Sequence, residues 1–231
     1  VMEWAQKNLV VPNPTYQKKK KMGLWLGKTP ENLCLYSQFW HELVVPFGCI
    51  NYLWKNYRTQ GEFTPYFKPL RKVNYRSSIK LREYQEEAVN AALRARNGVI
   101  VMPCGSGKTQ TALELIARIG GRALWIAHTA DLIKQSEERA KANFDLPDSD
   151  YGHITEGKIQ LGAITFATIQ TLCKVSLDEM STYFDVVVVD EAHHCVGSDT
   201  NLTMYQRVLS QLVARYKYGV TATPTRQDGL T

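Results

Sequence analysis

Long apolar segments and paired cysteines are both missing from this chain of 231 residues. No stretch approaches the roughly 18 uninterrupted apolar residues that a membrane-spanning helix needs, so we expect no membrane partner. The first residues lack an apolar run with a small-residue cleavage site, so no secretory signal is expected. The five cysteines include no C-x-x-C pair, which argues against a zinc site or a disulfide framework. We therefore expect an intracellular, reducing location, cytoplasmic or associated with the nucleoid.

Acidic residues are scarce in the first third of the chain. Residues 1–80 contain 13 Lys and Arg against 4 Asp and Glu, whereas residues 81–231 contain 15 against 18. The run Lys18–Lys21 lies close to Trp25, and the cations of residues 68–72 follow Tyr66 and Phe67. Such a mixture is typical of surfaces that bind nucleic acid, but a solvated charged face over a small aromatic core explains it equally well. The uneven charge favours nucleic acid as a partner.

Regular periodicity is also missing before residue 80, where prolines interrupt every possible long helix. After it, apolar strands alternate with helical patterns. Strands are expected at 98–102, 122–127, 160–165, 185–189 and 217–221, and helices at 81–95, 108–119, 130–143 and 202–214, with a short helix or turn at 176–180. This order predicts an α/β domain with a parallel sheet covered on both faces, over residues 79–231. Residues 1–78 are expected to form a basic, aromatic-rich accessory region, small α+β or irregular.

A glycine-rich segment, Pro103-Cys-Gly-Ser-Gly-Lys-Thr109, follows the first of these strands. Glycines let backbone N–H groups wrap a polyphosphate, Lys108 can reach the β- and γ-phosphates, and the Thr109 hydroxyl can hold Mg²⁺. Met102 stands where the usual pattern has a glycine, and a plain glycine-rich turn is the alternative interpretation. The predicted phosphate cradle consists of Gly105, Ser106, Gly107, Lys108 and Thr109.

A second motif, Asp190-Glu191, comes directly after four consecutive valines. A buried parallel strand that ends in two adjacent acids can bring both carboxylates to one γ-phosphate. Asp190 would then hold Mg²⁺, and Glu191 would orient and deprotonate the attacking water. An acid-rich helix start is the alternative interpretation.

Taken in order, these segments resemble the motifs of superfamily 2 helicases and translocases. The matching segments are Leu81–Gln85 (Q-type motif), Pro103–Thr109 (motif I), His128–Leu132 (Ia), Thr165–Gln170 (Ib), Asp190–His193 (II) and Val220–Pro224 (III). The tail Thr223–Gly229 resembles the branch of restriction-enzyme motors and xeroderma-pigmentosum-group-B-type repair helicases, except that Gln227 replaces the glutamate often found there. Residues 13–48 resemble, less specifically, the leader of some phage and mobile-element helicases.

The resemblance implies a RecA-like P-loop fold and ATP with Mg²⁺ as cofactors. It also implies ATP hydrolysis coupled to movement on nucleic acid, with DNA favoured over RNA. The implied roles are adenine binding for Arg82 and Gln85, contacts to one nucleic-acid strand for Thr129, Thr168 and Gln170, and coupling for His193, Thr221, Thr223 and Arg226. The ordinary alternatives are solvated helix residues for Arg82 and Gln85, and a capped turn for Thr221 and Thr223.

Superfamily 2 motors contain a second RecA-like domain, whose arginines complete the ATP site. This sequence begins at Val1 and ends at Thr231, just after the third motif. We therefore expect half of a motor that is nearly inactive by itself, with the second domain of the full-length protein as its partner. Two other functions remain open: a restriction-system motor that translocates without unwinding, and a nucleotide-gated nucleic-acid-binding module. The intact Lys108, Asp190 and Glu191 argue against the module.

Overall fold

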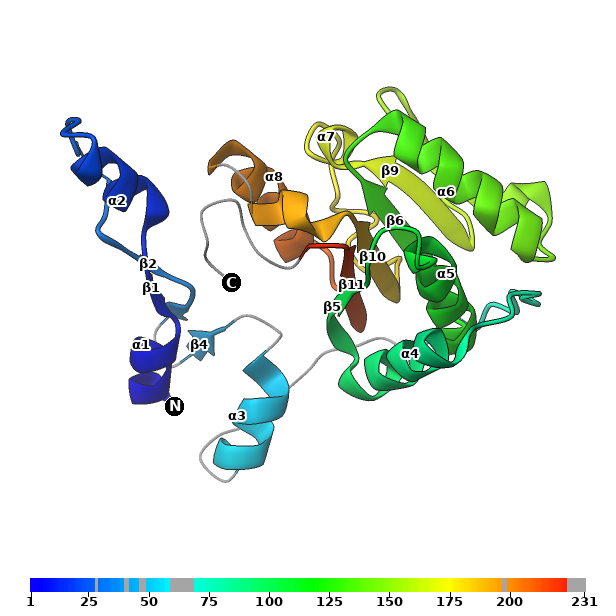
Figure 1. The fold of residues 1–231 in the computed structure, drawn as a ribbon, viewed down its shortest axis with the longest axis horizontal. Coiled ribbons are helices and arrows are strands. Elements are labelled where there is room, and N and C mark those ends of the chain that lie inside the picture. The colour runs from blue at the N-terminus through cyan, green and yellow to red at the C-terminus, as the bar shows by residue number, and fades with distance from the viewer. Residues whose placement is uncertain (28, 40–41, 46–48, 59–68, 197–198, 224–231) are drawn as a thin grey trace. The chain divides into compact units, whose positions relative to one another are not determined.

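The chain forms two compact units, residues 1–66 and residues 67–231, in the computed structural model (Figure 1). The structure describes the whole chain except residues 28, 40–41, 46–48, 59–68, 197–198 and 224–231. No helix in these described ranges is long and apolar enough to cross a membrane. The two units are described separately below.

The first unit is built from short elements, as its prolines require. Its helices are α1 (Met2–Asn8), α2 (Pro14–Lys21) and α3 (Ile50–Tyr57), and its antiparallel strand pairs are β1 (Val10–Pro12) with β2 (Asn32–Cys34) and β3 (Ser37–Phe39) with β4 (Glu42–Val44). Ala5, Leu9 and Leu53 are buried, and the Trp4 and Tyr52 rings stack with centroids 5.2 Å apart. Trp25 lies outside this small core, with 88% of its surface exposed.

The second unit contains a seven-stranded sheet with the order β5-β11-β10-β6-β9-β7-β8. Its strands are β5 (Asn97–Val101), β6 (Ala123–Ala127), β7 (Tyr151–Thr155), β8 (Lys158–Gln160), β9 (Ile164–Thr168), β10 (Val186–Asp190) and β11 (Tyr216–Thr221). All neighbouring strands are parallel except β7 and β8. The expected α/β class is therefore confirmed, and the sheet, which was expected to be parallel, is parallel except for the β7–β8 pair.

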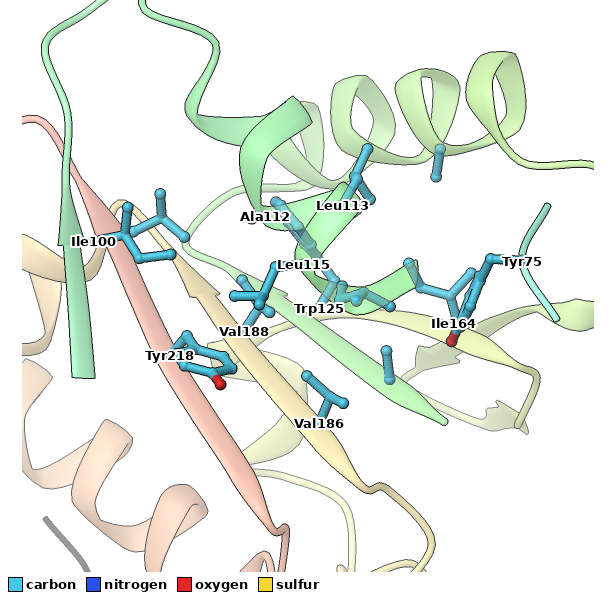
Figure 2. Packing of buried hydrophobic residues seen from close by; sticks show 14 of the residues in the cluster. Tyr75, Ile100, Ala112, Leu113, Leu115, Trp125, Ile164, Val186, Val188 and Tyr218 are labelled. Atoms are coloured by element: carbon cyan, nitrogen blue, oxygen red, sulfur yellow. The ribbon is translucent and has the colours of Figure 1, made fainter. Parts of the chain in front are cut away.

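Helices cover both faces of this sheet, because successive strand residues point to opposite sides. Trp125 and Val188 belong to a core with α4 (Glu83–Ala95), α5 (Lys108–Ile119) and α6 (Ala130–Asn143) (Figure 2). Leu124 and Val187 belong to a second core with α7 (Ile169–Leu172) and α8 (Asp199–Gln211). Arg118 of α5 pairs with Glu86 of α4 through two hydrogen bonds of 2.5 and 2.6 Å, which ties these helices together.

The expected strand at 160–165 is wrong. The chain instead ends β8 at Gln160 and begins β9 at Ile164. Gly162 lies between them, and a side chain there would clash with the carbonyl of Asp150. The edge hairpin of β7 and β8 was not predicted. The helices expected at 108–119 and 130–143 are confirmed at those bounds, whereas α8 begins and ends three residues earlier than expected.

The segment before α4 packs on the rest of the second unit through Tyr75. The Tyr75 hydroxyl donates to the carbonyls of Gly121 and Ala163, at 2.7 and 2.8 Å, and its ring lies 5.0 Å from that of Phe144. Contacts thus group residues 67–78 with the second unit. The boundary after residue 78, which separates sequence regions of different composition, stays a prediction.

Candidate nucleotide site and surrounding motifs

The glycine-rich segment forms the turn between β5 and α5. Gly105 and Gly107 have φ angles of +77° and +86°, a region that side chains rarely adopt. Gly107 directly precedes α5, so the first backbone N–H groups of this helix face the loop. A Cβ at Gly107 would lie 2.5 Å from Nε2 of Gln85. The loop therefore has the backbone of a phosphate cradle at a helix N-terminus.

Gln85 is buried, with 3% of its surface exposed, which excludes an ordinary solvated helix glutamine. Its Oε1 accepts from the backbone N–H of Arg82 at 2.8 Å, and its Nε2 donates to the Ser106 carbonyl at 2.8 Å. The Tyr84 hydroxyl donates to the same carbonyl at 2.9 Å, and Arg82 donates to that hydroxyl at 3.2 Å. The start of α4 is thus bonded to the phosphate loop. Adenine binding by Arg82 and Gln85 stays a prediction.

The two acids lie at the carboxyl end of β10, beside β11 and close to the loop after β5. Asp190 is 5% exposed, and burial raises the pKa of its carboxyl above the ordinary value. Its Oδ1 accepts from the backbone N–H of Glu191 at 3.0 Å. Glu191 has a φ of +48°, a strained conformation for a residue with a side chain. Its Oε1 lies 3.9 Å from Nζ of Lys108.

A cavity of about 390 Å³ brings the phosphate loop and the acid pair together. Its lining includes Gly107, Lys108, Thr109, Asp190 and Glu191. The Thr109 hydroxyl and the Asp190 carboxylate are hard oxygen donors of the kind that Mg²⁺ prefers, and both face this cavity. The residues present therefore fit a magnesium ion bound together with a nucleotide phosphate.

The third motif lies beside the second. His193, in the 3₁₀ helix η3 (Ala192–Val196), places Nδ1 3.0 Å from the Thr221 hydroxyl and 3.2 Å from Oε2 of Glu191. The Thr221 hydroxyl also accepts from the backbone N–H of Thr223 at 3.2 Å, so both threonines take part in a capped turn as well. Arg226 lies outside the described residues.

The predicted nucleic-acid contacts lie at the same edge of the sheet. Thr129 caps α6 by accepting from the Leu132 N–H at 3.3 Å. Thr168 caps α7 in the same way, and the register pairs Ala127 with Thr168. Gln170 Nε2 lies 3.4 Å from Nδ1 of His128. Whether these residues contact nucleic acid stays a prediction.

Three histidines form a stack that the sequence did not reveal. The His128 and His194 rings stack at 4.7 Å between centroids, and the His194 and His193 rings lie 4.2 Å apart. The stack joins the loop after β6 to η3. Burial, and then the charges of His193 and His128, lower the pKa of His194. His128 and His194 are 66 positions apart in the sequence, and this spacing gives no signal of their contact.

Arg139 is a second residue that sequence reasoning missed. Its Nη1 donates to the Thr109 hydroxyl at 2.8 Å, and it lines the cavity together with Leu132, Gln135 and Ser136. These four positions share one face of a helix by their spacing of three and four residues. The sequence predicts the helix, but it does not predict that this face of α6 lines the nucleotide cavity, because that depends on how α6 packs on the sheet.

A phosphate loop and an acid pair at the carboxyl edge of a largely parallel sheet define a P-loop nucleotide-binding domain of the RecA-like type. A family model described as "Type III restriction enzyme, res subunit" matches residues 78–226, and the chain belongs to this family.

Two curated relatives are named as a DNA translocase and a DNA helicase. The chain is 36% identical to "DNA 3'-5' translocase XPB2" of Sulfurisphaera tokodaii, over 67% of the chain and 33% of the relative. It is 32% identical to "Putative DNA 3'-5' helicase Rad25" of Haloarcula marismortui, over 65% of the chain and 24% of the relative. The chain thus spans a third or less of the length of these proteins.

Among solved structures, the UvsW helicase from bacteriophage T4 resembles the chain with a TM-score of 0.65. The match covers 96% of this chain and 85% of that one at 17% identity. At this identity the likeness concerns the fold, and it extends into the first unit.

Proposed function

We propose that this chain is the first motor domain of an ATP-dependent DNA helicase or translocase. The observation that carries the proposal is the cavity in which Lys108, Thr109, Asp190 and Glu191 meet. The relatives named as a DNA 3'-5' translocase and a DNA 3'-5' helicase support DNA as the substrate and 3'-5' as the direction. The free thiols of all five cysteines support an intracellular, reducing location.

In the proposed ATP hydrolysis, each residue of the site has a separate role. Loop N–H groups and Lys108 would bind the phosphates, and Arg82 and Gln85 would bind the adenine. Thr109 and Asp190 would hold Mg²⁺, which supplies positive charge against the phosphates during transfer. Glu191 orients the attacking water and accepts its proton, and its contacts with Lys108 and His193 position that carboxylate.

Coupling is proposed to pass through the residues beside the acid pair. His193 contacts both Glu191 and Thr221. A displacement of Glu191 when the γ-phosphate is lost would therefore move Thr221 of the third motif. Thr223 and Arg226 would extend this link towards the second domain. Thr129, Thr168 and Gln170 would contact one DNA strand through its backbone, which positions the strand without reading its sequence.

A second RecA-like domain is the proposed partner of this one. Its arginines would complete the ATP site, and the absence of such an arginine lowers turnover by roughly 10³–10⁵-fold. We therefore expect this chain alone to bind Mg-ATP or ADP weakly and to hydrolyse little ATP. Robust turnover by the chain alone would contradict the half-motor proposal.

The test uses a protein that joins this chain to its second RecA-like domain. ATP hydrolysis is measured without nucleic acid, with single- and double-stranded DNA, and with RNA. We expect stimulation by DNA and loss of turnover in Lys108→Ala. Equal rates with and without nucleic acid would contradict a motor function.

Translocation without unwinding is a second candidate, favoured by the restriction-enzyme family and the translocase relative. Displacement of a third strand from a triplex reports movement, whereas separation of a duplex reports unwinding. A protein that displaces the third strand but leaves duplexes intact is a translocase only.

A further inference from the structure

Arg139 lies on the face of α6 that lines the nucleotide cavity. Arg139 is an exposed residue, yet its guanidinium reaches the buried Thr109. The bond of 2.8 Å from Nη1 to Oγ1 joins α6 to the first turn of α5. Thr109 is also the hydroxyl that would bind the metal.

The oxygen of a threonine hydroxyl has two lone pairs and one proton. A guanidinium that donates to this oxygen uses one lone pair and places a positive charge at hydrogen-bond distance. Mg²⁺ needs a lone pair of the same oxygen at about 2.1 Å, in a near-octahedral shell. Two cations so close repel each other strongly in a partly buried cavity. Arg139 and Mg²⁺ therefore compete for Thr109.

The charges of the cavity explain why an arginine is favoured there without a metal. Asp190 and Glu191 are adjacent, and Asp190 is buried. Lys108 approaches Glu191, at 3.9 Å, whereas Arg139 adds a second positive charge beside Thr109. The charges of Lys108 and Arg139 both act to lower the pKa of Asp190, against the larger effect of its burial.

We propose that Arg139 is a positioning residue that holds the Thr109 hydroxyl while no metal is bound and that must leave it when Mg²⁺ enters. The inference rests on the proposed nucleotide site. It predicts that the Arg139 side chain sets how much Mg²⁺ is needed to load the site. Thr129, a proposed contact to nucleic acid, caps the same helix. The position of α6 therefore affects both the proposed nucleotide site and the proposed nucleic-acid site.

The experiment is calorimetric titration of the 231-residue chain with ADP over a series of free Mg²⁺ concentrations. The measured quantity is the Mg²⁺ concentration that gives half of the full Mg²⁺-dependent gain in ADP affinity. For Arg139→Gln this concentration should fall about fivefold, as expected for the loss of one competing hydrogen bond. Arg139→Lys, which keeps the charge but not the planar fork, should lie between this variant and the wild type.

Lys134→Gln is the matched control. Lys134 is exposed on the same helix and does not line the cavity, so this change removes an equal charge without removing the contact. It should leave the Mg²⁺ requirement within experimental error of the wild type. An equal fall in Lys134→Gln would mean that the net charge of α6 acts from a distance, and would overturn the inference.

The remaining outcomes separate the two proposals. If the folded wild type binds no ADP at any Mg²⁺ concentration, the nucleotide site itself is wrong, and the inference falls with it. If the wild type binds Mg-ADP and Arg139→Gln needs as much Mg²⁺ or more, only the inference is overturned. If Arg139→Gln weakens ADP equally with and without Mg²⁺, Arg139 is a phosphate ligand and not a competitor of the metal.

Discussion

Asp190 has an environment that opposes its own charge. The carboxylate is 5% exposed at the end of a strand buried on both faces, and burial raises its pKa. A raised pKa in the folded state means that ionisation costs stability at neutral pH. Protonated Asp190 contributes fully to the free energy of unfolding below the unfolded pKa of about 3.8. This contribution is lost as the pH rises through the higher pKa of Asp190 in the folded protein.

Asp190→Asn should therefore stabilise the metal-free protein at pH 8. Asparagine is shaped like the protonated acid and can still accept from the Glu191 N–H. A gain of about 1 kcal/mol would raise the unfolding midpoint by roughly 2–4 °C. The same variant should lose the stabilisation that Mg-ADP gives the wild type. A lower midpoint for the metal-free variant would show that the charge of Asp190 is already compensated.

Glu191→Gln tests the general base. The amide keeps the shape and the contact with His193 but cannot accept a proton, so ATP should still bind. In a protein that also contains the second RecA-like domain, turnover should fall by at least about 10²-fold. Fluorescent-nucleotide binding and phosphate release measure the two properties separately. Near-normal phosphate release would assign the base to another residue.

At the scale of elements, local sequence signals gave the helices and central strands of the nucleotide-binding unit. Thr129 before α6 and the valines before Asp190 are signals that depend on near neighbours alone. The turn at Gly162 and the hairpin of β7 and β8 depend on the close approach of Asp150, which is distant in space until the chain folds. The same limit applies to the site. The motifs were readable, whereas Arg139 and the histidine stack arise from how α6 and η3 pack.

The histidine stack predicts a dependence of stability on pH. The pKa of His194 is lowered by burial and by the charges of His193 and His128, which outweigh the opposite effect of Glu191. Stability from a neutral His194 is therefore present above the unfolded pKa of about 6.5 and is lost as the pH falls through the lower, folded pKa.

His194→Asn should lose less stability than the wild type between pH 7 and pH 5. Urea unfolding at several pH values measures the difference. His153→Asn is a suitable control, because His153 lies on β7 next to Glu137 and away from the stack. Parallel pH profiles for the wild type and His194→Asn would contradict this account of the stack.

On the scale of the whole molecule, charge is divided between the two ends of the sequence. Residues 1–80 carry a net charge of +9 and residues 81–231 one of −3, by the residue counts of the sequence. In the basic part, Trp25 is exposed, Lys19 donates to the Thr29 hydroxyl at 3.0 Å, and Lys20 lies over the Tyr16 ring. The side chain of Lys18 lies outside the described residues. An exposed indole a few residues after four consecutive lysines suits stacking on a single strand.

Replacing Lys18, Lys19, Lys20 and Lys21 by Ala should weaken DNA binding and flatten its salt dependence. Each phosphate contact to a single strand contributes roughly 0.7 to the slope of log affinity against log salt concentration. DNA titrations at several salt concentrations measure this slope, and ADP affinity should not change. Superimposable curves for both proteins would leave the residues after β6 and β9 as the proposed DNA contacts.

The central claim is that the loop Pro103–Thr109 and the acid pair form a nucleotide site. Its most direct test is calorimetric titration of this chain with Mg-ADP, for the wild type and for Lys108→Ala, with Lys134→Ala as a control on an exposed lysine. The account predicts weak but saturable binding of one ADP to the wild type and the control, and a loss of at least tenfold in Lys108→Ala. A folded wild type that binds no ADP, or a Lys108→Ala variant that binds it equally well, would contradict the account.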